Sequence, residues 1–192
     1  MSKRSYYIIN GITVYRIIAA PFLVFLIFTG NTVLFSRLLA LSFFTDLIDG
    51  YLARKFKVTG IFGARLDSIA DDLTIIAAII GLFVLKPEFI RQEMVIMCVL
   101  LGLYLFQNAA AIIKYRKISS FHTYSAKTAA ILQGVFLILV FFLPDPYYPL
   151  FYAAILATAI DLIEETILIF LLPKWEVNVK GLYWVLRKKK KA

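Results

Sequence analysis

Residues 45–72 read TDLIDGYLARKFKVTGIFGARLDSIADD and place four aspartates in two apolar segments: Asp46, Asp49, Asp67 and Asp71. A charged carboxylate at the centre of a bilayer costs roughly 2.5–3.5 kcal/mol on insertion scales, so four of them need a counter-charge. The first two are three residues apart and the last two are four apart, which places each pair on one face of a helix. Two such helices can form an all-oxygen site for a hard divalent cation such as Mg²⁺. The stretch therefore predicts a metal-dependent membrane enzyme.

The composition places the whole chain in a membrane. Of its 192 residues, 61% are hydrophobic and 16% are aromatic, and the mean hydropathy is +0.83. A soluble domain of this length cannot bury so much apolar surface, so we expect an all-α polytopic membrane protein with one domain over residues 1–192. The single cysteine, Cys98, excludes an intrachain disulfide.

Six apolar runs are long enough to cross a hydrocarbon core of ~30 Å at ~1.5 Å per residue. They lie near residues 11–29, 33–53, 68–85, 93–113, 127–143 and 149–172. Turn-forming residues separate them, for example Thr29-Gly30-Asn31 and Pro144-Asp145-Pro146. A cleavable signal peptide is the competing interpretation of the first run. We expect a retained helix instead, because no A-x-A-like site follows and the next run begins almost at once.

Basic residues alternate in number from one connection to the next. The connections after the second and fourth runs hold Arg54, Lys55, Lys57, Arg65, Lys114, Arg116, Lys117 and Lys127. The opposite connections carry little beyond Lys86 and Arg91. By the positive-inside rule we expect six transmembrane helices with both termini in the cytoplasm, in the cell (inner) membrane.

The ends of the chain are also basic. Residues 1–9 are expected to form an interfacial segment, and residues 174–192 a basic cytoplasmic tail that ends in Lys188–Lys191. The net charge is +9, and we expect the Lys188–Lys191 tail to lie against anionic membrane lipids, at roughly 1 kcal/mol per basic residue near the surface. The chain lacks a basic-and-aromatic module for nucleic acid, so we expect no nucleic-acid partner.

This topology brings the four aspartates to one depth. The second run reaches the cytoplasmic side at its end and the third run starts there, so the carboxylates should meet in a cavity that faces the cytoplasm. Pairing with an arginine is the structural alternative, and it could explain one or two of the carboxylates. The candidate arginines are Arg16, Arg54 and Arg65.

The same stretch fits the pattern D-x2-D-G-x2-A-R-x8-G-x3-D-x3-D over residues 46–71. This pattern resembles, position for position, the signature of the CDP-alcohol phosphatidyltransferases, in particular members that make phosphatidylglycerophosphate or phosphatidylinositol phosphate. The resemblance in layout covers nearly the whole chain, while the motif covers 26 residues. It implies an enzyme that transfers a phosphatidyl group from CDP-diacylglycerol to an acceptor hydroxyl and releases CMP, in phospholipid biosynthesis. It also implies a homodimer.

The resemblance assigns roles to individual residues. It implies that Asp46, Asp49, Asp67 and Asp71 hold two Mg²⁺ ions, with Mn²⁺ as a possible substitute, and that Asp71 is also the general base. It implies that the CDP part of the substrate is bound by Asn10, Thr13, Arg16, Gly50, Ala53, Arg54, Thr59 and Gly63.

Several of these assignments have structural alternatives. Asn10 begins an N-x2-T-x2-R opening that is similar to the family's, but it could equally be the N-cap of the first run. Gly50 and Ala53 could serve close helix packing. Gly63 is expected in the turn into the third run. Many relatives have a hydroxyl residue where this chain has Gly60, with Thr59 beside it.

The acceptor is predicted from a basic cluster. Arg65, Lys114, Arg116, Lys117 and Lys127 suit a phosphorylated acceptor such as glycerol 3-phosphate or inositol phosphate. The alternative is charge that only sets topology. Phosphatidylglycerophosphate-forming relatives often have lysine directly after the last aspartate, where this chain has Asp72.

Three further carboxylates lie on one face of the sixth run: Asp161, Glu164 and Glu165. They could neutralise the basic cluster or Arg65, or contact a cationic acceptor such as serine. Two other classes stay open: a Mg-dependent membrane prenyltransferase, which would release pyrophosphate, and an ion transporter, which would consume no nucleotide lipid.

Overall fold

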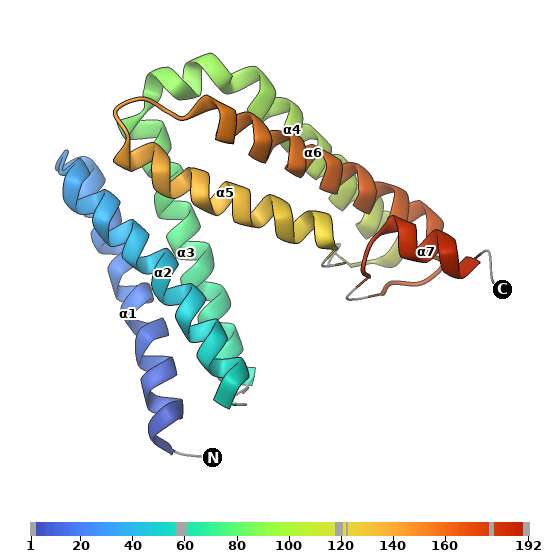
Figure 1. Cartoon of the computed structure of the whole chain (residues 1–192), viewed down its shortest axis with the longest axis horizontal. Helices are drawn as coiled ribbons and strands as arrows, with labels where there is room; N and C mark the ends of the chain where they lie inside the picture. The colour runs from blue at the N-terminus through green and yellow to red at the C-terminus, as the bar shows by residue number, and fades with distance from the viewer. Residues whose placement is uncertain (1–2, 57–60, 118–120, 122, 177–178, 190–192) are drawn as a thin grey trace. The chain divides into compact units, whose positions relative to one another are not determined.

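The computed structural model describes residues 3–56, 61–117, 121, 123–176 and 179–189, and within them the chain forms seven α-helices and no strand (Figure 1). The helices are α1 (Lys3–Phe28), α2 (Thr32–Phe56), α3 (Ile61–Leu85), α4 (Pro87–Tyr115), α5 (Tyr124–Phe142), α6 (Tyr148–Leu171) and α7 (Leu182–Lys189). Each predicted apolar run lies in one of the first six helices, apart from one final residue in three of the runs. The prediction of an all-α chain is therefore confirmed for the described residues.

The chain divides into two compact units, residues 1–91 and 92–192. In the first unit α1 packs along both α2 and α3. Several buried side chains in these helices are small, namely Ala19 and Ala20 on α1 and Ala70, Ala77 and Ala78 on α3. Small residues let helix backbones approach closely in membranes. As a result, α1 lies against both helices that carry the motif aspartates.

The α1–α2 turn shows how local sequence directs the path of the chain. Gly30 has a φ of 71°, which glycine adopts without a clash from a Cβ atom. The Asn31 side chain accepts a hydrogen bond from the backbone N–H of Leu34 at 3.2 Å. This contact satisfies one free donor at the start of α2.

Two expectations about helix ends are wrong. Helix α1 runs without a break from Lys3 to Phe28, so Asn10 lies inside the helix and is not its N-cap. Helix α3 begins at Ile61, so Gly63 lies inside the helix rather than in the turn before it. Extending a formed helix adds one hydrogen bond per residue, and neither stretch contains a proline to stop it.

In the second unit α5 packs along α6, and a buried apolar cluster lies at one end of the pair. Its members are Ala111, Phe121, Leu168, Ile169, Leu172 and Val179. Leu182 and Val185 of α7 pack against this cluster, which explains why a helix forms in the predicted basic tail. A helix of eight residues is too short to be stable alone, so burial of these side chains decides its formation.

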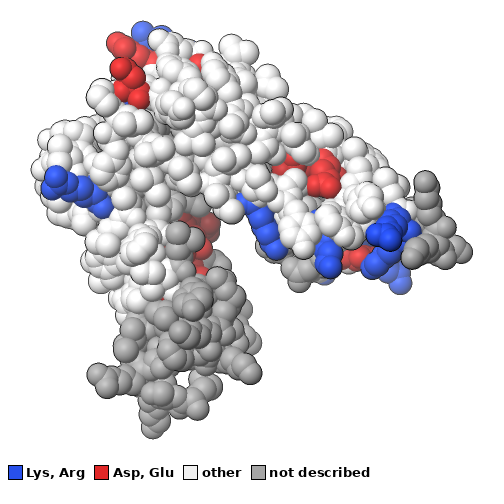
Figure 2. All heavy atoms as spheres, viewed as in Figure 1, with Lys and Arg blue, Asp and Glu red and all other residues white. Residues whose placement is uncertain are grey.

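Within the described part of the chain, three helical segments are long and apolar enough to cross a membrane by length and composition: Gly11–Phe28, Pro87–Tyr115 and Tyr124–Phe142. The other three long helices, α2, α3 and α6, carry the clustered carboxylates. Large apolar side chains are widely exposed, for example Val95 at 79% and Ile113 at 80%. Most of the described surface in Figure 2 is uncharged. These features are those of a membrane protein, whose surface faces lipid.

Candidate active site

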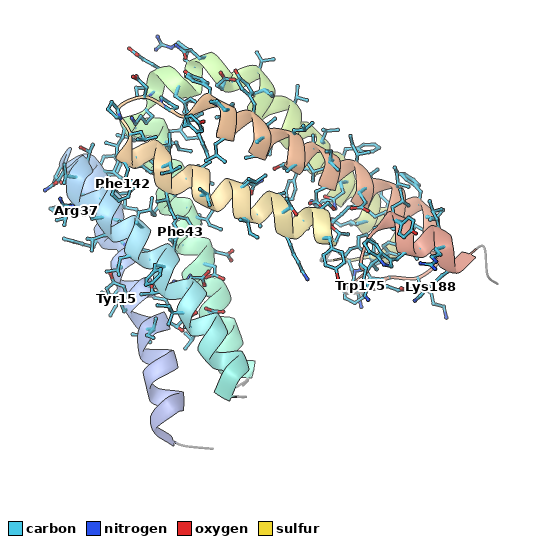
Figure 3. The ribbon with its side chains drawn as sticks, viewed as in Figure 1. Tyr15, Arg37, Phe43, Phe142, Trp175 and Lys188 are labelled. Carbon is cyan, nitrogen blue, oxygen red and sulfur yellow. The ribbon has the colours of Figure 1, made fainter. Side chains whose placement is uncertain are left out.

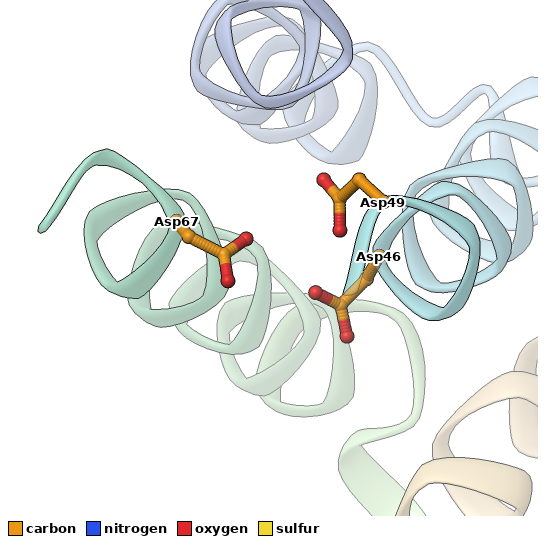
Figure 4. Close-up of side chains that lie close together, drawn as sticks. All are labelled: Asp46, Asp49 and Asp67. Atoms are coloured by element: carbon orange, nitrogen blue, oxygen red, sulfur yellow. The ribbon is translucent and has the colours of Figure 1, made fainter. Parts of the chain in front are cut away.

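Three motif aspartates converge in the first unit. Asp46 and Asp49 extend from α2 and Asp67 from α3, and one carboxylate oxygen from each lies within 4.8 Å of the others (Figure 4). Asp49 lies seven residues before the end of α2 and Asp67 six residues after the start of α3. Both are therefore about 10 Å from the connection between the helices at ~1.5 Å per residue, which brings them to the same depth.

Arg16 of α1 lies among these carboxylates. Its Nη1 atom is 2.8 Å from an oxygen of Asp46, 3.5 Å from Asp49 and 3.3 Å from Asp67. Its Nη2 atom donates a hydrogen bond to Asp71. The sequence predicted that an arginine could pair with one or two carboxylates, and that number is wrong. One guanidinium contacts all four, because α1 packs on both α2 and α3.

The site is closed on one side and accessible on the other. The side chains of Arg16 and Asp49 are each only 2% exposed. Asp46, Asp67 and Asp71 are 34%, 40% and 39% exposed, so a ligand can reach them. Asp72 is exposed and takes no part in the contacts of Arg16 described here.

The four predicted metal ligands are not equivalent. Asp46, Asp49 and Asp67 form the close group, whereas Asp71 lies outside it and is tied to Nη2 of Arg16. Carboxylate oxygens from two helices are a suitable donor set for a hard divalent cation. One guanidinium does not balance four carboxylates. On both grounds the residues present fit a divalent metal.

The predicted CDP contacts fall into two groups. Thr13 and Arg16 lie in the site, where the Thr13 hydroxyl donates to Asp49 at 3.4 Å and both side chains are buried. Gly63 lies in the second position after the start of α3. Asn10, Gly50, Ala53 and Arg54 are helical, but their side chains lie outside the described part, and Thr59 lies outside the described residues altogether.

The basic residues predicted to bind the acceptor have structural partners in the second unit. The Lys114 Nζ atom donates to the carbonyl oxygens of Ile169 at 2.8 Å and Phe170 at 3.1 Å, at the end of α6. Lys117 lies over the ring of Trp175, with Nζ 4.4 Å from the ring centroid. Trp175, labelled in Figure 3, follows the end of α6. Lys114 thus stabilises a helix end, which the sequence did not predict.

The remaining three acceptor candidates differ from one another. Lys127 lies over the ring of Tyr124, with Nζ 5.4 Å from the centroid. Arg116 is exposed and has a φ of 57°, in the left-handed region. The side chain of Arg65, in the first unit, lies outside the described part.

The acidic residues of α6 bind neutral donors. Asp161 accepts hydrogen bonds from the hydroxyls of Thr123 at 2.9 Å and Ser125 at 3.0 Å. Glu164 accepts from the Ser125 hydroxyl with one oxygen and from the backbone N–H of Leu182, at 2.6 Å, with the other.

A third acidic side chain, Glu165, is buried and accepts from the Gln107 amide on α4. These contacts match neither of the two roles that the sequence left open for the α6 carboxylates. They join α6 to α4, to the start of α5 and to α7. Thr123 also accepts from the backbone N–H of Ala126 at 3.0 Å, as an N-cap. Thr123, directly before the first residue of α5, was the available signal in the sequence for this junction, because threonine is a favoured N-cap residue.

Comparison with known proteins identifies the family to which the chain is similar. The sequence profile of the CDP-alcohol phosphatidyltransferase family matches residues 6–168. A CDP-diacylglycerol–glycerol-3-phosphate 3-phosphatidyltransferase of Haemophilus influenzae is 38% identical over 72 residues, which are 36% of this chain and 39% of that protein. The CDP-diacylglycerol–glycerol-3-phosphate 3-phosphatidyltransferase 1, chloroplastic/mitochondrial, of Arabidopsis thaliana is 40% identical over 80 residues. These residues are 40% of this chain and 26% of that protein.

Another relative, with a different name, is a cardiolipin synthase (CMP-forming)/mitochondrial hydrolase fusion protein of Schizosaccharomyces pombe. It is 39% identical over 62 residues, 32% of this chain and 10% of that protein. The matched region therefore spans about two fifths or less of the length of these relatives. No solved structure matches the chain. The family profile spans most of the chain and includes every aspartate of the site, so this protein belongs to the CDP-alcohol phosphatidyltransferase family.

Proposed function

We propose that this protein transfers a phosphatidyl group from CDP-diacylglycerol to the hydroxyl of glycerol 3-phosphate and releases CMP, in phospholipid synthesis. The observation that carries the proposal is the group of three aspartate oxygens, from two helices, within 4.8 Å of one another. Family membership supports the reaction class. The names of the Haemophilus and Arabidopsis relatives support the donor and the acceptor.

Asp46, Asp49 and Asp67 would hold Mg²⁺, or Mn²⁺ in its place, and Asp71 would complete a site for two ions. When bound, the metal supplies positive charge that stabilises the diphosphate and the leaving phosphate oxygens. The carboxylates fix the position of that charge, since each comes from a rigid helix. Buried Asp49 anchors the closed side of the site, and the more exposed Asp46 and Asp67 border the accessible side.

Asp71 is the proposed general base. It lies outside the close group and is 39% exposed, which supports a role at the accessible side of the site. A carboxylate there can take the proton of the acceptor hydroxyl while the oxygen of that hydroxyl forms a bond to the lipid-side phosphorus. The bond from this phosphorus to the oxygen of the CMP group breaks, and CMP leaves with the electron pair. In the structure the Asp71 carboxylate accepts a hydrogen bond from Nη2 of Arg16.

The CDP part of the substrate would be bound by the opening of α1 and the motif glycines. Thr13 and Arg16 supply the polar side chains of this proposal within the described part. Asn10, Gly50, Ala53, Arg54, Thr59 and Gly63 complete it by family resemblance.

The acceptor phosphate is assigned to basic side chains on the strength of their charge alone. Arg116 and Lys127 are the stronger candidates, because Lys114 is engaged at the end of α6. A serine-type acceptor would need a carboxylate partner. The names of the Haemophilus and Arabidopsis relatives favour a phosphorylated acceptor instead.

In the membrane we propose six transmembrane helices with both termini and the active site at the cytoplasmic side of the cell (inner) membrane. Six helices of 19 to 29 residues and the alternation of basic connections support this topology. Exposed Tyr183, Trp184, Arg187 and Lys188 on α7 support contact with anionic lipids at the interface. A homodimer is proposed from family resemblance.

The test is an assay of purified protein in detergent with CDP-diacylglycerol and Mg²⁺. Release of CMP would be measured with glycerol 3-phosphate, inositol phosphate, serine and phosphatidylglycerol in turn. We expect CMP release that depends on glycerol 3-phosphate and on the divalent ion. Release of CMP with another acceptor only would replace the substrate assignment, and release of pyrophosphate from a prenyl donor would overturn the reaction class.

A further inference from the structure

Arg16 stands at the centre of the group of aspartates that fits a metal. Its Nη1 atom lies between 2.8 and 3.5 Å from an oxygen of each of Asp46, Asp49 and Asp67. These are the same three residues whose oxygens lie within 4.8 Å of one another. Mg²⁺ takes carboxylate oxygens at about 2.0–2.1 Å. A guanidinium nitrogen and a divalent ion therefore cannot both occupy this small space.

Arg16 is surrounded by carboxylates as a bound metal ion would be, and its Nη1 atom does not form a short hydrogen bond to each of them. Nη1 has two hydrogens and faces three carboxylates, and two of the three distances exceed 3.2 Å. Two of these contacts are thus longer than ordinary hydrogen bonds to a charged group. A single positive charge also leaves most of the negative charge of four aspartates unbalanced.

Arg16 retains an unused donor. Its Nε atom is buried and has no hydrogen-bond acceptor among the described residues. A buried donor without an acceptor is unfavourable, and phosphate oxygens are the acceptors that match a guanidinium best. The oxygens of a diphosphate would satisfy this donor and pair with the charge.

We propose that Arg16 is an internal substitute for the metal, displaced when divalent ions bind and then paired with the diphosphate of the substrate. This inference rests on the proposed function. It follows from charge: two divalent ions together with Arg16 exceed four carboxylates by one positive charge, and the two negative charges of the diphosphate offset that excess. Metal loading is then weak in the free protein and is strengthened by the nucleotide-linked lipid.

The experiment measures Mn²⁺ binding to the full chain in detergent, by the loss of the free-ion electron paramagnetic resonance signal, with and without CDP-diacylglycerol and without acceptor. Arg16→Gln removes the charge, and Arg16→Lys retains it. Arg37→Gln is the matched control, since it removes one arginine charge from α2, nine residues before Asp46 (Figure 3).

We expect Arg16→Gln to bind Mn²⁺ at least about tenfold more tightly than the unaltered chain when no lipid is present, equivalent to ~1.4 kcal/mol. Arg16→Lys and Arg37→Gln should stay within about threefold of the unaltered chain, because both keep a positive charge at the site. CDP-diacylglycerol should strengthen Mn²⁺ binding more in the unaltered chain than in Arg16→Gln. Equal or weaker Mn²⁺ binding by Arg16→Gln would overturn the inference.

Two outcomes separate this inference from the proposed function. Normal Mn²⁺ binding and CMP release, with no change in affinity in Arg16→Gln, would remove the role of Arg16 and leave the enzyme assignment intact. No Mn²⁺ binding by any variant, with or without lipid, would overturn both. If Arg16→Gln does not fold, Arg16→Gln/Asp71→Asn replaces it, with Asp71→Asn as its reference and the same expected tightening. That pair also removes the carboxylate on Nη2 and keeps the group of three.

Discussion

The ammonium group of Lys114, on α4, donates a hydrogen bond to the carbonyl oxygen of Ile169, on α6, at 2.8 Å. The last carbonyl groups of a helix have no partner within the helix and carry partial negative charge. Lys114 satisfies two of them, those of Ile169 and Phe170. Lys114 also lies close in sequence to Ala111 of the apolar cluster and to Tyr115, which packs against that cluster, so we assign it a role in stability rather than in substrate binding.

The first prediction concerns this contact. Lys114→Met should lower the melting temperature of the second unit, because charge-assisted hydrogen bonds contribute roughly 1.5–3 kcal/mol and 1 kcal/mol shifts Tm by about 2–4 °C at this chain length. The KM for glycerol 3-phosphate should change less than about twofold. Thermal unfolding and saturation curves measure the two quantities. The control is Lys174→Met, an exposed lysine shortly after α6. A Lys114 variant with unaltered Tm and a much higher acceptor KM would return this residue to the acceptor site.

The second prediction concerns the acceptor. Arg116→Gln and Lys127→Gln should each raise the KM for glycerol 3-phosphate by at least about tenfold, at ~1.4 kcal/mol per decade, and leave the KM for CDP-diacylglycerol nearly unchanged. Arg116 has a backbone conformation in the left-handed region. Glutamine, like arginine, is a non-glycine residue, so the substitution should not change the conformational energy of the backbone there. Saturation curves for both substrates test this. An equal loss toward both substrates, or no loss, would leave these charges with a topological role.

The third prediction concerns the aspartates. Asp49→Asn and Asp67→Asn should each lower turnover by about 10²–10³-fold, because each removes a charged group from the close cluster of three. Asp72→Asn is the internal control, since Asp72 is exposed and points about 100° away from Asp71 around the helix. The rate of CMP release measures the effect. Retention of more than about a tenth of the activity in either variant would contradict the proposed metal site.

The fourth prediction concerns the attachment of α7. Gly181 has a φ of 145°, and a Cβ atom there would lie 2.9 Å from Glu164 Oε1 and 3.2 Å from the Trp184 ring. Gly181→Ala should therefore destabilise α7 by roughly 1–3 kcal/mol and speed amide hydrogen exchange in residues 179–189. Gly102→Ala is the matched control, because nothing lies within 4 Å of its Cβ position and alanine favours a helix. Unaltered exchange in Gly181→Ala would show that α7 is not held by this junction.

The fifth prediction concerns topology. In a Cys98→Ser background, Asp145→Cys should react with a membrane-impermeant maleimide from the outside of intact cells, and Lys174→Cys should react only after the membrane is opened. Both positions are exposed in the structure. Reaction of Asp145→Cys from the cytoplasmic side alone would refute the proposed orientation.

The sequence by itself determined the helices and the identity of the charged residues in the site. The apolar composition and the length of a run are local properties, so all six long runs are visible in the amino-acid sequence. The spacing of Asp46 and Asp49, and of Asp67 and Asp71, likewise predicted that each pair lies on one face of its helix, because helical geometry fixes it. The ends of the helices were harder to predict from the sequence, because α1 and α3 each begin several residues before the apolar run that they contain.

Only the tertiary structure decided which side chains meet. Arg16 is 30 residues from Asp46 and 55 from Asp71, and its contact with all four aspartates depends on the packing of α1 against α2 and α3. In the same way, Glu164 meets Leu182 and Lys114 meets Ile169 because α6 packs beside other elements. A charged residue in the sequence shows that a partner is needed, since burial of an unpaired charge is costly. Which partner it finds depends on distances between helices, which no local pattern encodes.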